Sequence, residues 1–313
     1  MPRPASLVAT ALGLGVAALV ALAAAPRPAA AFPHVLAPGE TLATVAERVY
    51  GRVELEQVLV AANGLDLPGA GPTVPGMRIE VPAVGYHRAS PGDTWENLAA
   101  RHLGDARRSD VLARANDALL WVPPAPGREL VIPYNLRYVV KPGDSTMTIA
   151  YRFLGKRDLA WIVDRYNDLD GDAVARGDVV LVPLTDLPLT DDGREQARAG
   201  AVLARAEGEG DGHEAQERVD AELPDLASAV RAGRWLDVAV RGNQLLGYGD
   251  LADPQLARIH RMWLEAYAAL GAAALAEEAC AEWRRADPDA ELDPVWLSPK
   301  LLKACADAAS HRR

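Results

Sequence analysis

The chain has 313 residues, of which half are apolar and 5% aromatic, and its formal net charge is −10. The acidic excess argues against a protein that binds nucleic acid by neutralising phosphates, and against a polybasic membrane-surface protein. With only two cysteines, a disulfide-dense scaffold and a zinc site built from four cysteines are both excluded.

The first 31 residues have the layout of a secretory signal peptide. Arg3 provides a positive start, residues 7–25 are uncharged and rich in Ala, Leu and Val, and residues 29–31 fit a cleavage site for small side chains. An uncleaved membrane anchor is the alternative, because the apolar run is near the minimum length for a span. We therefore expect export to the periplasm or cell wall, with no transmembrane span after cleavage.

Three copies of one pattern follow, over residues 34–83, 86–134 and 137–184. Each copy opens with Pro-Gly, an acidic residue and Thr or Ser, and closes with a Gly and, six positions later, a Pro. A Gly stands thirteen residues after the opening Pro, and an Asn stands twenty-five residues after it. Matched offsets in three copies identify an internal repeat, with variable length confined to one loop.

Each conserved offset has a physical role in a β-α-α-β unit. Pro-Gly suits a type II turn, and the following Thr or Ser can cap a helix. The central Gly is expected to end the first helix in the left-handed conformation, and the Asn to end the second helix in the same way. Because two strands alone are marginally stable, we expect an antiparallel pair covered on one face by the helices.

This pattern resembles the lysin motif (LysM) in all three copies, through its G-D-T/S turn, its central Gly and Asn, and its G-x-x-[IVL]-x-[IVL]-P ending. The resemblance implies binding of N-acetylglucosamine polymers, peptidoglycan or a chitin-like glycan, in a shallow groove between two loops. The residues that it implies as ligand contacts are Gly39, Glu40, Thr41, Leu42, Gly64 and Leu65 in the first copy, Gly92, Asp93, Thr94, Asp117 and Trp121 in the second, and Gly143, Asp144, Ser145, Thr146 and Asp168 in the third.

Many of these residues also have a purely structural explanation as turn and cap residues. Trp95 lies at an inward helical position and is expected in the core, whereas Trp121 lies in a loop and could stack on a sugar ring. The first copy has Glu40 where the motif usually has Asp, and the third copy has Thr146 and Met147 where the motif is more regular. Which copies bind is therefore left open.

The second half is acidic and helical. Residues 185–221 are expected to form a linker, with one helix over 191–206 and a break at 207–212. Apolar spacing then predicts helices from residue 222, over 233–246, from Pro254, over 274–287 and from Pro299. The segments 266–271, 276–279 and 287–288 resemble tetratricopeptide repeats, which implies a protein partner in the cell envelope; a small helical cap without a partner is the alternative. Cys280 and Cys305 could form a disulfide if their helices pack together.

The chain lacks the linear motifs of common hydrolases. No two histidines have the spacing of a metal site, and neither G-x-S-x-G nor S-x-x-K occurs. A glycosidase needs two positioned carboxylates, and the acidic second half has enough of them to leave a helical muramidase open. Such an enzyme would need a deep cleft, and about 90 helical residues are few for building one. The sequence therefore predicts no catalytic residues, no metal and no cofactor.

These observations predict an α+β chain of three tandem LysM-type modules followed by an all-α helical-hairpin domain over 222–313. The predicted function is that of a secreted, non-catalytic protein that binds peptidoglycan and contacts a protein partner through its helices. The alternatives are an envelope scaffold whose modules no longer bind glycan, and a targeting subunit of a wall hydrolase.

Overall fold

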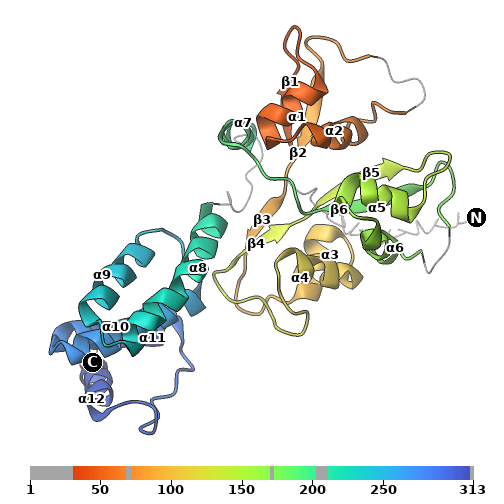
Figure 1. Cartoon of the computed structure of the whole chain (residues 1–313). Helices are drawn as coiled ribbons and strands as arrows, with labels where there is room; N and C mark the ends of the chain where they lie inside the picture. The colour runs from red at the N-terminus through yellow and green to blue at the C-terminus, as the bar shows by residue number, and fades with distance from the viewer. Residues whose placement is uncertain (1–30, 68–71, 170–172, 202–210, 311–313) are drawn as a thin grey trace, which may run out of the picture.

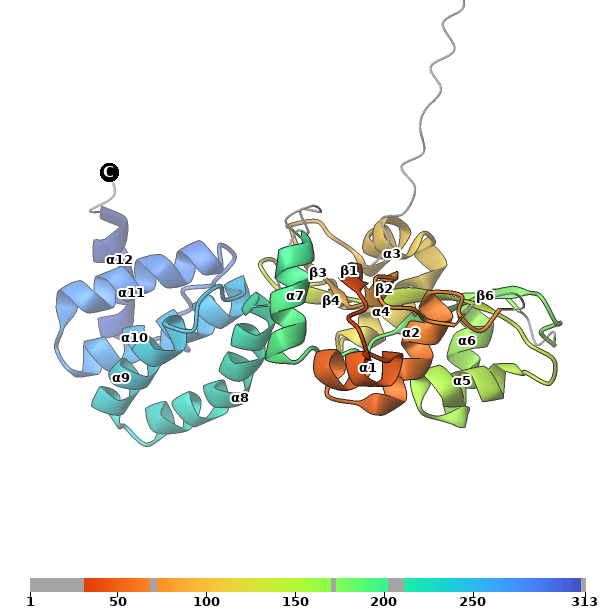
Figure 2. The ribbon, with the colours of Figure 1, turned by 90° about the horizontal axis from the view of Figure 1, so that it is seen from above.

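The computed structural model describes residues 31–67, 72–169, 173–201 and 211–310. These residues form an α+β structure with three separate two-stranded sheets. Figure 1 shows the sheet-bearing units gathered at one end of an elongated molecule, and Figure 2 shows the C-terminal helices at the other end. Two predicted segments lie almost wholly outside the described residues. Of the predicted signal peptide only Ala31 is described, and of the break predicted at 207–212 only the last two residues are described.

Three consecutive β-α-α-β units, here called units 1 to 3, form the first half, each with a 3₁₀ turn between its helices. Unit 1 consists of β1 (Ala31–Val35), α1 (Leu42–Tyr50), η1 (Val53–Leu55), α2 (Glu56–Ala62) and β2 (Arg78–Pro82). Unit 2 consists of β3 (Gly85–Arg88), α3 (Trp95–Leu103), η2 (Ala106–Arg108), α4 (Ser109–Ala115) and β4 (Glu129–Ile132). Unit 3 consists of β5 (Tyr134–Val139), α5 (Thr146–Leu154), η3 (Arg157–Leu159), α6 (Ala160–Tyr166) and β6 (Val179–Leu184).

The strands pair antiparallel within each unit, as predicted: β1 with β2, β3 with β4 and β5 with β6. The first helix of each unit begins where the sequence placed its cap, because the cap hydroxyl accepts a hydrogen bond from the backbone N–H three residues later. These cap residues are Thr41, Thr94 and Ser145. The central Gly of each unit ends that helix at a positive φ between 70° and 79°, as expected.

The prediction for the second helices was wrong in one respect. The asparagines that end them have φ values of −100°, −114° and −114°, outside the left-handed region. The next residue of each unit takes the left-handed conformation instead: Gly64, Asp117 and Asp168, at φ 62°, 50° and 53°. The asparagine side chain is free to cross to the closing strand, where it binds the backbone of one strand residue.

The three units pack into one body. One hydrophobic core combines residues of units 1 and 3, including Leu59, Val81, Leu136 and Ile149, all nearly inaccessible to solvent. The core of unit 2 extends into unit 3 through buried residues of α6. Very short connections between the closing strand of one unit and the opening strand of the next hold the units together. The repeat is therefore a fused assembly rather than a string of free modules.

A helix beyond the repeats returns to unit 1. α7 (Asp191–Ala201) lies within the predicted linker, and its preceding residue Thr190 donates its N–H to the Val49 carbonyl at 2.8 Å. A Cβ on Gly193 would lie 2.5 Å from that same carbonyl oxygen, so only glycine allows this approach. Figure 2 shows α7 between the units and the C-terminal helices.

The C-terminal region is helical, as predicted. It contains α8 (Asp211–Arg231), α9 (Trp235–Leu246), α10 (Asp253–Ala269), α11 (Ala273–Ala286) and α12 (Pro299–Ser310). α8 begins inside the predicted linker and continues through Pro224. A disulfide joins Cys280 on α11 to Cys305 on α12, with Cα atoms 5.3 Å apart, so the structure has the pairing that the sequence left open. None of the helices in the described ranges is both long and apolar enough to cross a membrane.

A buried polar network joins the helical region to unit 2. The Gln216 side chain on α8 accepts a hydrogen bond from the Glu129 N–H at 2.9 Å and donates one to the Gly127 carbonyl at 2.9 Å. The N–H of His213 donates to the Glu129 carboxylate at 2.7 Å. Gln216 and Glu129 are both buried, and buried polar groups satisfied in this way fix one mutual arrangement of the two parts.

Candidate functional site

Each unit carries the same group of three polar side chains around its first loop, here called the polar triad. The group combines a residue of the opening strand, the acidic residue of the Pro-Gly turn and an arginine of the first helix. The three triads are His34, Glu40 and Arg48 in unit 1, His87, Asp93 and Arg101 in unit 2, and Tyr138, Asp144 and Arg152 in unit 3.

In unit 1 the carboxylate is the centre of the triad. Glu40 accepts hydrogen bonds from the Ala37 N–H at 3.0 Å and from Arg48, and its Oε2 lies 2.8 Å from His34 Nε2. Partial burial favours the neutral acid, but these hydrogen bonds outweigh it and lower the pKa of Glu40 to about 2. The carboxylate therefore stays ionised and holds one nitrogen of the imidazole ring.

The same arrangement is more enclosed in unit 2. His87 Nε2 lies 3.1 Å from Asp93 Oδ2, and the Ser90 N–H donates to that oxygen at 2.9 Å. Burial raises the pKa of Asp93, but the hydrogen bonds from Ser90 and His87 outweigh it, so the pKa is lowered. The second ring nitrogen of His87, Nδ1, is buried without a hydrogen-bond partner. No ligand can reach that nitrogen unless unit 2 opens.

A tyrosine replaces the histidine in unit 3. Tyr138 donates its hydroxyl hydrogen to Asp144 Oδ2 at 2.6 Å, and Arg152 lies 3.2 Å from the other carboxylate oxygen. Burial raises the pKa of Asp144, but these contacts outweigh it and lower the pKa. Sequence reasoning identified the three acids and missed the strand and helix partners, although each partner stands at a fixed offset from its acid.

The residues predicted as ligand contacts in the first loops mostly turn toward the protein. The hydroxyls of Thr41, Thr94 and Ser145 serve as helix caps, and Leu42 is buried. The three glycines after the turn prolines have φ values of 81°, 90° and 85°, as the predicted type II turns require: Gly39, Gly92 and Gly143. Thr146 is the first residue of α5. These loops therefore present mainly backbone N–H and C=O groups to a ligand.

The second loops differ from unit to unit. Gly64 begins the loop of unit 1, where Leu65 packs partly buried against the core. Asp168 in unit 3 forms an ion pair at 2.6 Å with Arg107 of unit 2. In unit 2, Asp117 is exposed and Trp121 is 78% exposed. The predicted contacts are thus dispersed, and those of unit 2 are the most accessible.

Unit 2 also joins its two loops directly. The Trp95 indole N–H donates to the Val122 carbonyl at 2.7 Å, which links the start of α3 to the second loop. Trp95 is buried, as its helical position predicted. The indole thereby fixes the position of the exposed loop that contains Trp121.

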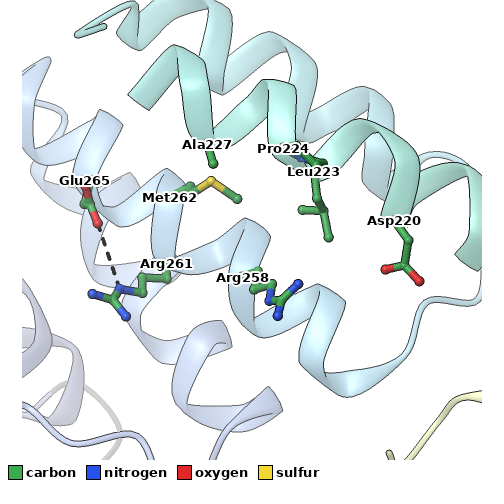
Figure 3. A pocket seen from close by; sticks show the side chains of 8 residues that line it. All are labelled: Asp220, Leu223, Pro224, Ala227, Arg258, Arg261, Met262 and Glu265. Atoms are coloured by element: carbon green, nitrogen blue, oxygen red, sulfur yellow. Dashed lines mark ion pairs between the residues drawn. The ribbon is translucent and has the colours of Figure 1, made fainter. Parts of the chain in front are cut away.

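A groove of about 330 Å³ lies in the helical region between α8 and α10. Figure 3 shows apolar side chains of both helices facing the groove, with charged groups around them. Arg261 and Glu265 form an ion pair at 3.9 Å on its wall. The lining residues are Asp220, Leu223, Pro224, Ala227, Arg258, Arg261, Met262 and Glu265. Burial raises the pKa of Glu265 while Arg261 lowers it, and the pKa is raised on balance. The lining contains no histidine, serine or cysteine, so it offers no usual nucleophile.

Within the described part of the chain, no cluster of three or more His, Cys, Asp or Glu residues is arranged to hold a metal ion. Among the described residues, histidines lie against carboxylates in the pairs His34 with Glu40, His87 with Asp93, and His213 with Glu217.

The chain is similar to two curated proteins of Mycobacterium tuberculosis. "Esterase MT1326" of strain CDC 1551 / Oshkosh and "Esterase Rv1288" of strain ATCC 25618 / H37Rv are each 32% identical to it over 150 residues. The match covers 48% of this chain and 32% of each relative, so the chain spans about a third of their length. No family model matches the chain.

These names overturn the sequence-based prediction of a non-catalytic wall-binding protein, because both relatives are named for a hydrolytic activity. The same names contradict the prediction of no enzymatic activity. Neither name refers to a lysin motif or to peptidoglycan. The prediction rested mainly on the absence of linear motifs and on the small size of the helical region. Catalytic groups of hydrolases come together by geometry and occur in several chain orders, so a missing motif does not establish a missing activity.

Proposed function

We propose that this chain takes part in the hydrolysis of carboxylic esters. The observation that carries the proposal is its 32% identity, over about half its length, to two proteins named as esterases. In that reaction water adds to the acyl carbon, the ester C–O bond breaks, and the alcohol leaves with a proton. A group that accepts a proton from the attacking nucleophile near neutral pH is therefore needed.

His34 is the proposed general base. Both ring nitrogens of His213 are engaged, by Glu217 and by the Glu129 carbonyl, and the second nitrogen of His87 is buried. His34 keeps 14% of its side chain exposed, against 7% for His87. The Glu40 carboxylate contacts Nε2 of His34 and stays ionised. It would therefore stabilise the imidazolium that forms when the ring takes up a proton.

The resemblance of units 1 to 3 to LysM modules supports a more specific proposal about the substrate. In it the ester is carried on an N-acetylglucosamine polymer such as peptidoglycan, and the units hold that polymer while an acyl group is removed. The fused packing of the units supports a single extended surface for such a chain molecule. Export to the periplasm or cell wall, proposed from residues 1–31, would bring the protein to this substrate.

The test is hydrolysis by the purified full chain of p-nitrophenyl butyrate, and release of acetate from O-acetylated peptidoglycan. The expected result is saturable hydrolysis of both substrates, with a general base contributing to the chemical step. His34→Gln should lower kcat about 100-fold. His87→Gln is the matched control, because it alters the equivalent triad at a buried site and should leave kcat nearly unchanged.

Absence of hydrolysis on both substrates would overturn the proposed activity. Hydrolysis that His34→Gln leaves intact, but that a fluorophosphonate blocks, would retain the activity and reject His34 as the base. Activity on p-nitrophenyl butyrate without acetate release would reject the glycan ester alone.

A further inference from the structure

The connection between α4 and β4 of unit 2 exposes a continuous apolar tip. Residues 118–127 contain no charged side chain, and the four large apolar residues at 119–122 are all open to solvent. The exposed fractions are 54% for Leu119, 37% for Leu120, 78% for Trp121 and 49% for Val122. Single exposed apolar residues are common on protein surfaces, but a run of four with a tryptophan at its tip is a marked feature.

The tip is held in place at both ends. A turn closes it, because the Val122 N–H donates to the Leu119 carbonyl at 2.9 Å. Leu120 and Trp121 occupy the two central positions of that turn. The buried Trp95 indole binds the Val122 carbonyl, and farther along the Asp253 N–H of the helical region donates to the Pro126 carbonyl at 3.1 Å. The exposed side chains are therefore presented by a fixed backbone.

We propose that this tip, residues 119–122, inserts into the surface of a lipid layer. Leucine and valine gain free energy on leaving water for hydrocarbon, and tryptophan favours the boundary between hydrocarbon and water. A fluid lipid layer can close around a small convex tip, whereas a stable protein interface buries about 800 Å² on each partner. Four side chains on one turn offer too little area for a protein contact of that kind.

The chemistry of the segment also favours lipid over sugar. Over residues 118–127 the Trp121 indole N–H is the only polar side-chain group. A sugar ring stacked on Trp121 through its C–H face would find no side-chain hydrogen-bond partner for its hydroxyls on the neighbouring leucines and valine, and hydroxyls buried without partners are costly. Lipid acyl chains demand no such partners.

Electrostatics determine which lipid surface suits the tip. The chain has a formal net charge of −10, so an anionic surface would repel it at long range. Close to the tip, Asp117 is exposed, and Arg114 lies over the Trp161 ring at 5.7 Å. Binding should therefore rest on apolar insertion, and neutral zwitterionic lipid should be preferred.

The experiment is cosedimentation of the full chain with phosphatidylcholine vesicles, together with quenching of tryptophan fluorescence by brominated phosphatidylcholine. The wild-type chain should bind and show quenching. Leu120→Ser with Trp121→Ser should weaken partitioning about tenfold or more and remove most of the quenching. Because both side chains are exposed, the variant should keep the far-ultraviolet circular dichroism and melting midpoint of the wild type.

Trp296→Ser provides a matched control. Trp296 is 79% exposed on the connection between α11 and α12, away from unit 2, and its loss should leave vesicle binding unchanged. Three results would overturn the inference: no binding of the wild-type chain, equal losses in the control and the tip variant, or binding that needs anionic lipid and disappears with salt. Retention on peptidoglycan that depends on Trp121, without vesicle binding, would assign the tip to glycan instead. Vesicle binding is measured without hydrolysis, so it is independent of the proposed esterase activity.

Discussion

Replacing Asn116 by alanine tests how each unit holds its second helix against its closing strand. The Asn116 amide donates to the Leu112 carbonyl at 2.9 Å and to the Val131 carbonyl at 2.9 Å. Its oxygen accepts the Val131 N–H at 2.7 Å. One side chain thus ends α4 and continues the hydrogen bonding of β4, whose strand partner in the described part of the chain is β3.

The expected magnitude follows from these three bonds. A hydrogen bond within a folded protein contributes about 0.5–1.5 kcal/mol net, and a buried group left without its partner costs more. Asn116→Ala removes all three bonds and leaves the Val131 N–H unpaired. We therefore expect the free energy of unfolding of unit 2 to fall by about 2–4 kcal/mol.

Native-state hydrogen exchange gives the local readout, because it reports the opening of individual amides. Protection of the Val131 amide should fall by a factor of 30 or more, since about 1.4 kcal/mol corresponds to tenfold. Asn243→Ala, at an exposed position of α9, is the control and should leave that amide unchanged. A loss below about 1 kcal/mol, or an equal loss in the control, would refute the structural role given to this asparagine.

Three further changes test other features of the fold. Gly242→Ala should destabilise the helical region by about 1–3 kcal/mol in urea unfolding, because the added Cβ would lie 2.2 Å from the Trp263 Nε1. Alanine stabilises an exposed helix relative to glycine, so a stabilised variant would contradict this packing. Reducing the disulfide between Cys280 and Cys305 should cost about 3 kcal/mol by the loop-entropy estimate, and an unchanged melting midpoint in dithiothreitol would count against it. Glu40 has its pKa lowered in the folded state from 4.5 to about 2, so its contribution is present above the ordinary value and lost as the pH falls toward 2. The difference in melting midpoint between wild type and Glu40→Gln should therefore be largest near neutral pH and vanish near pH 2, and a difference independent of pH would contradict the assignment.

Much of the fold follows from the sequence because its signals are local. The Pro-Gly turns, the Thr and Ser caps and the left-handed glycines act within a few residues, and their positions were predicted correctly. The role of the asparagines was predicted incorrectly because it depends on a partner strand far along the chain, as in the bond from Asn167 to Leu181. Local preference alone favours a left-handed asparagine, but the long-range bonds decide the conformation.

The candidate site was less predictable from sequence. The acids of the triads stand out in the turn motif, but their partners lie on a strand and on the far end of a helix. His34 and Arg48, for example, meet at Glu40 only after the unit has folded. The exposure of Trp121 and the burial of Trp95 were both expected, because one lies in a loop and the other at an inward helical position. The activity suggested by the relatives has no linear motif in this chain and could not be predicted in that way.

Packing makes three similar units chemically different. Asp66, in the second loop of unit 1, forms an ion pair with Lys141 in the first loop of unit 3. Asp168, in the second loop of unit 3, is held in the same way by Arg107 of unit 2. The corresponding loop of unit 2 contacts the helical region at its base and leaves its apolar tip exposed. Since a loop that binds a neighbouring unit has fewer groups for an external ligand, the surface that meets other molecules should be sought first on unit 2. A mutation that breaks the Asp66–Lys141 pair should accordingly weaken the association of units 1 and 3 and leave the contacts made by residues 119–122 unchanged.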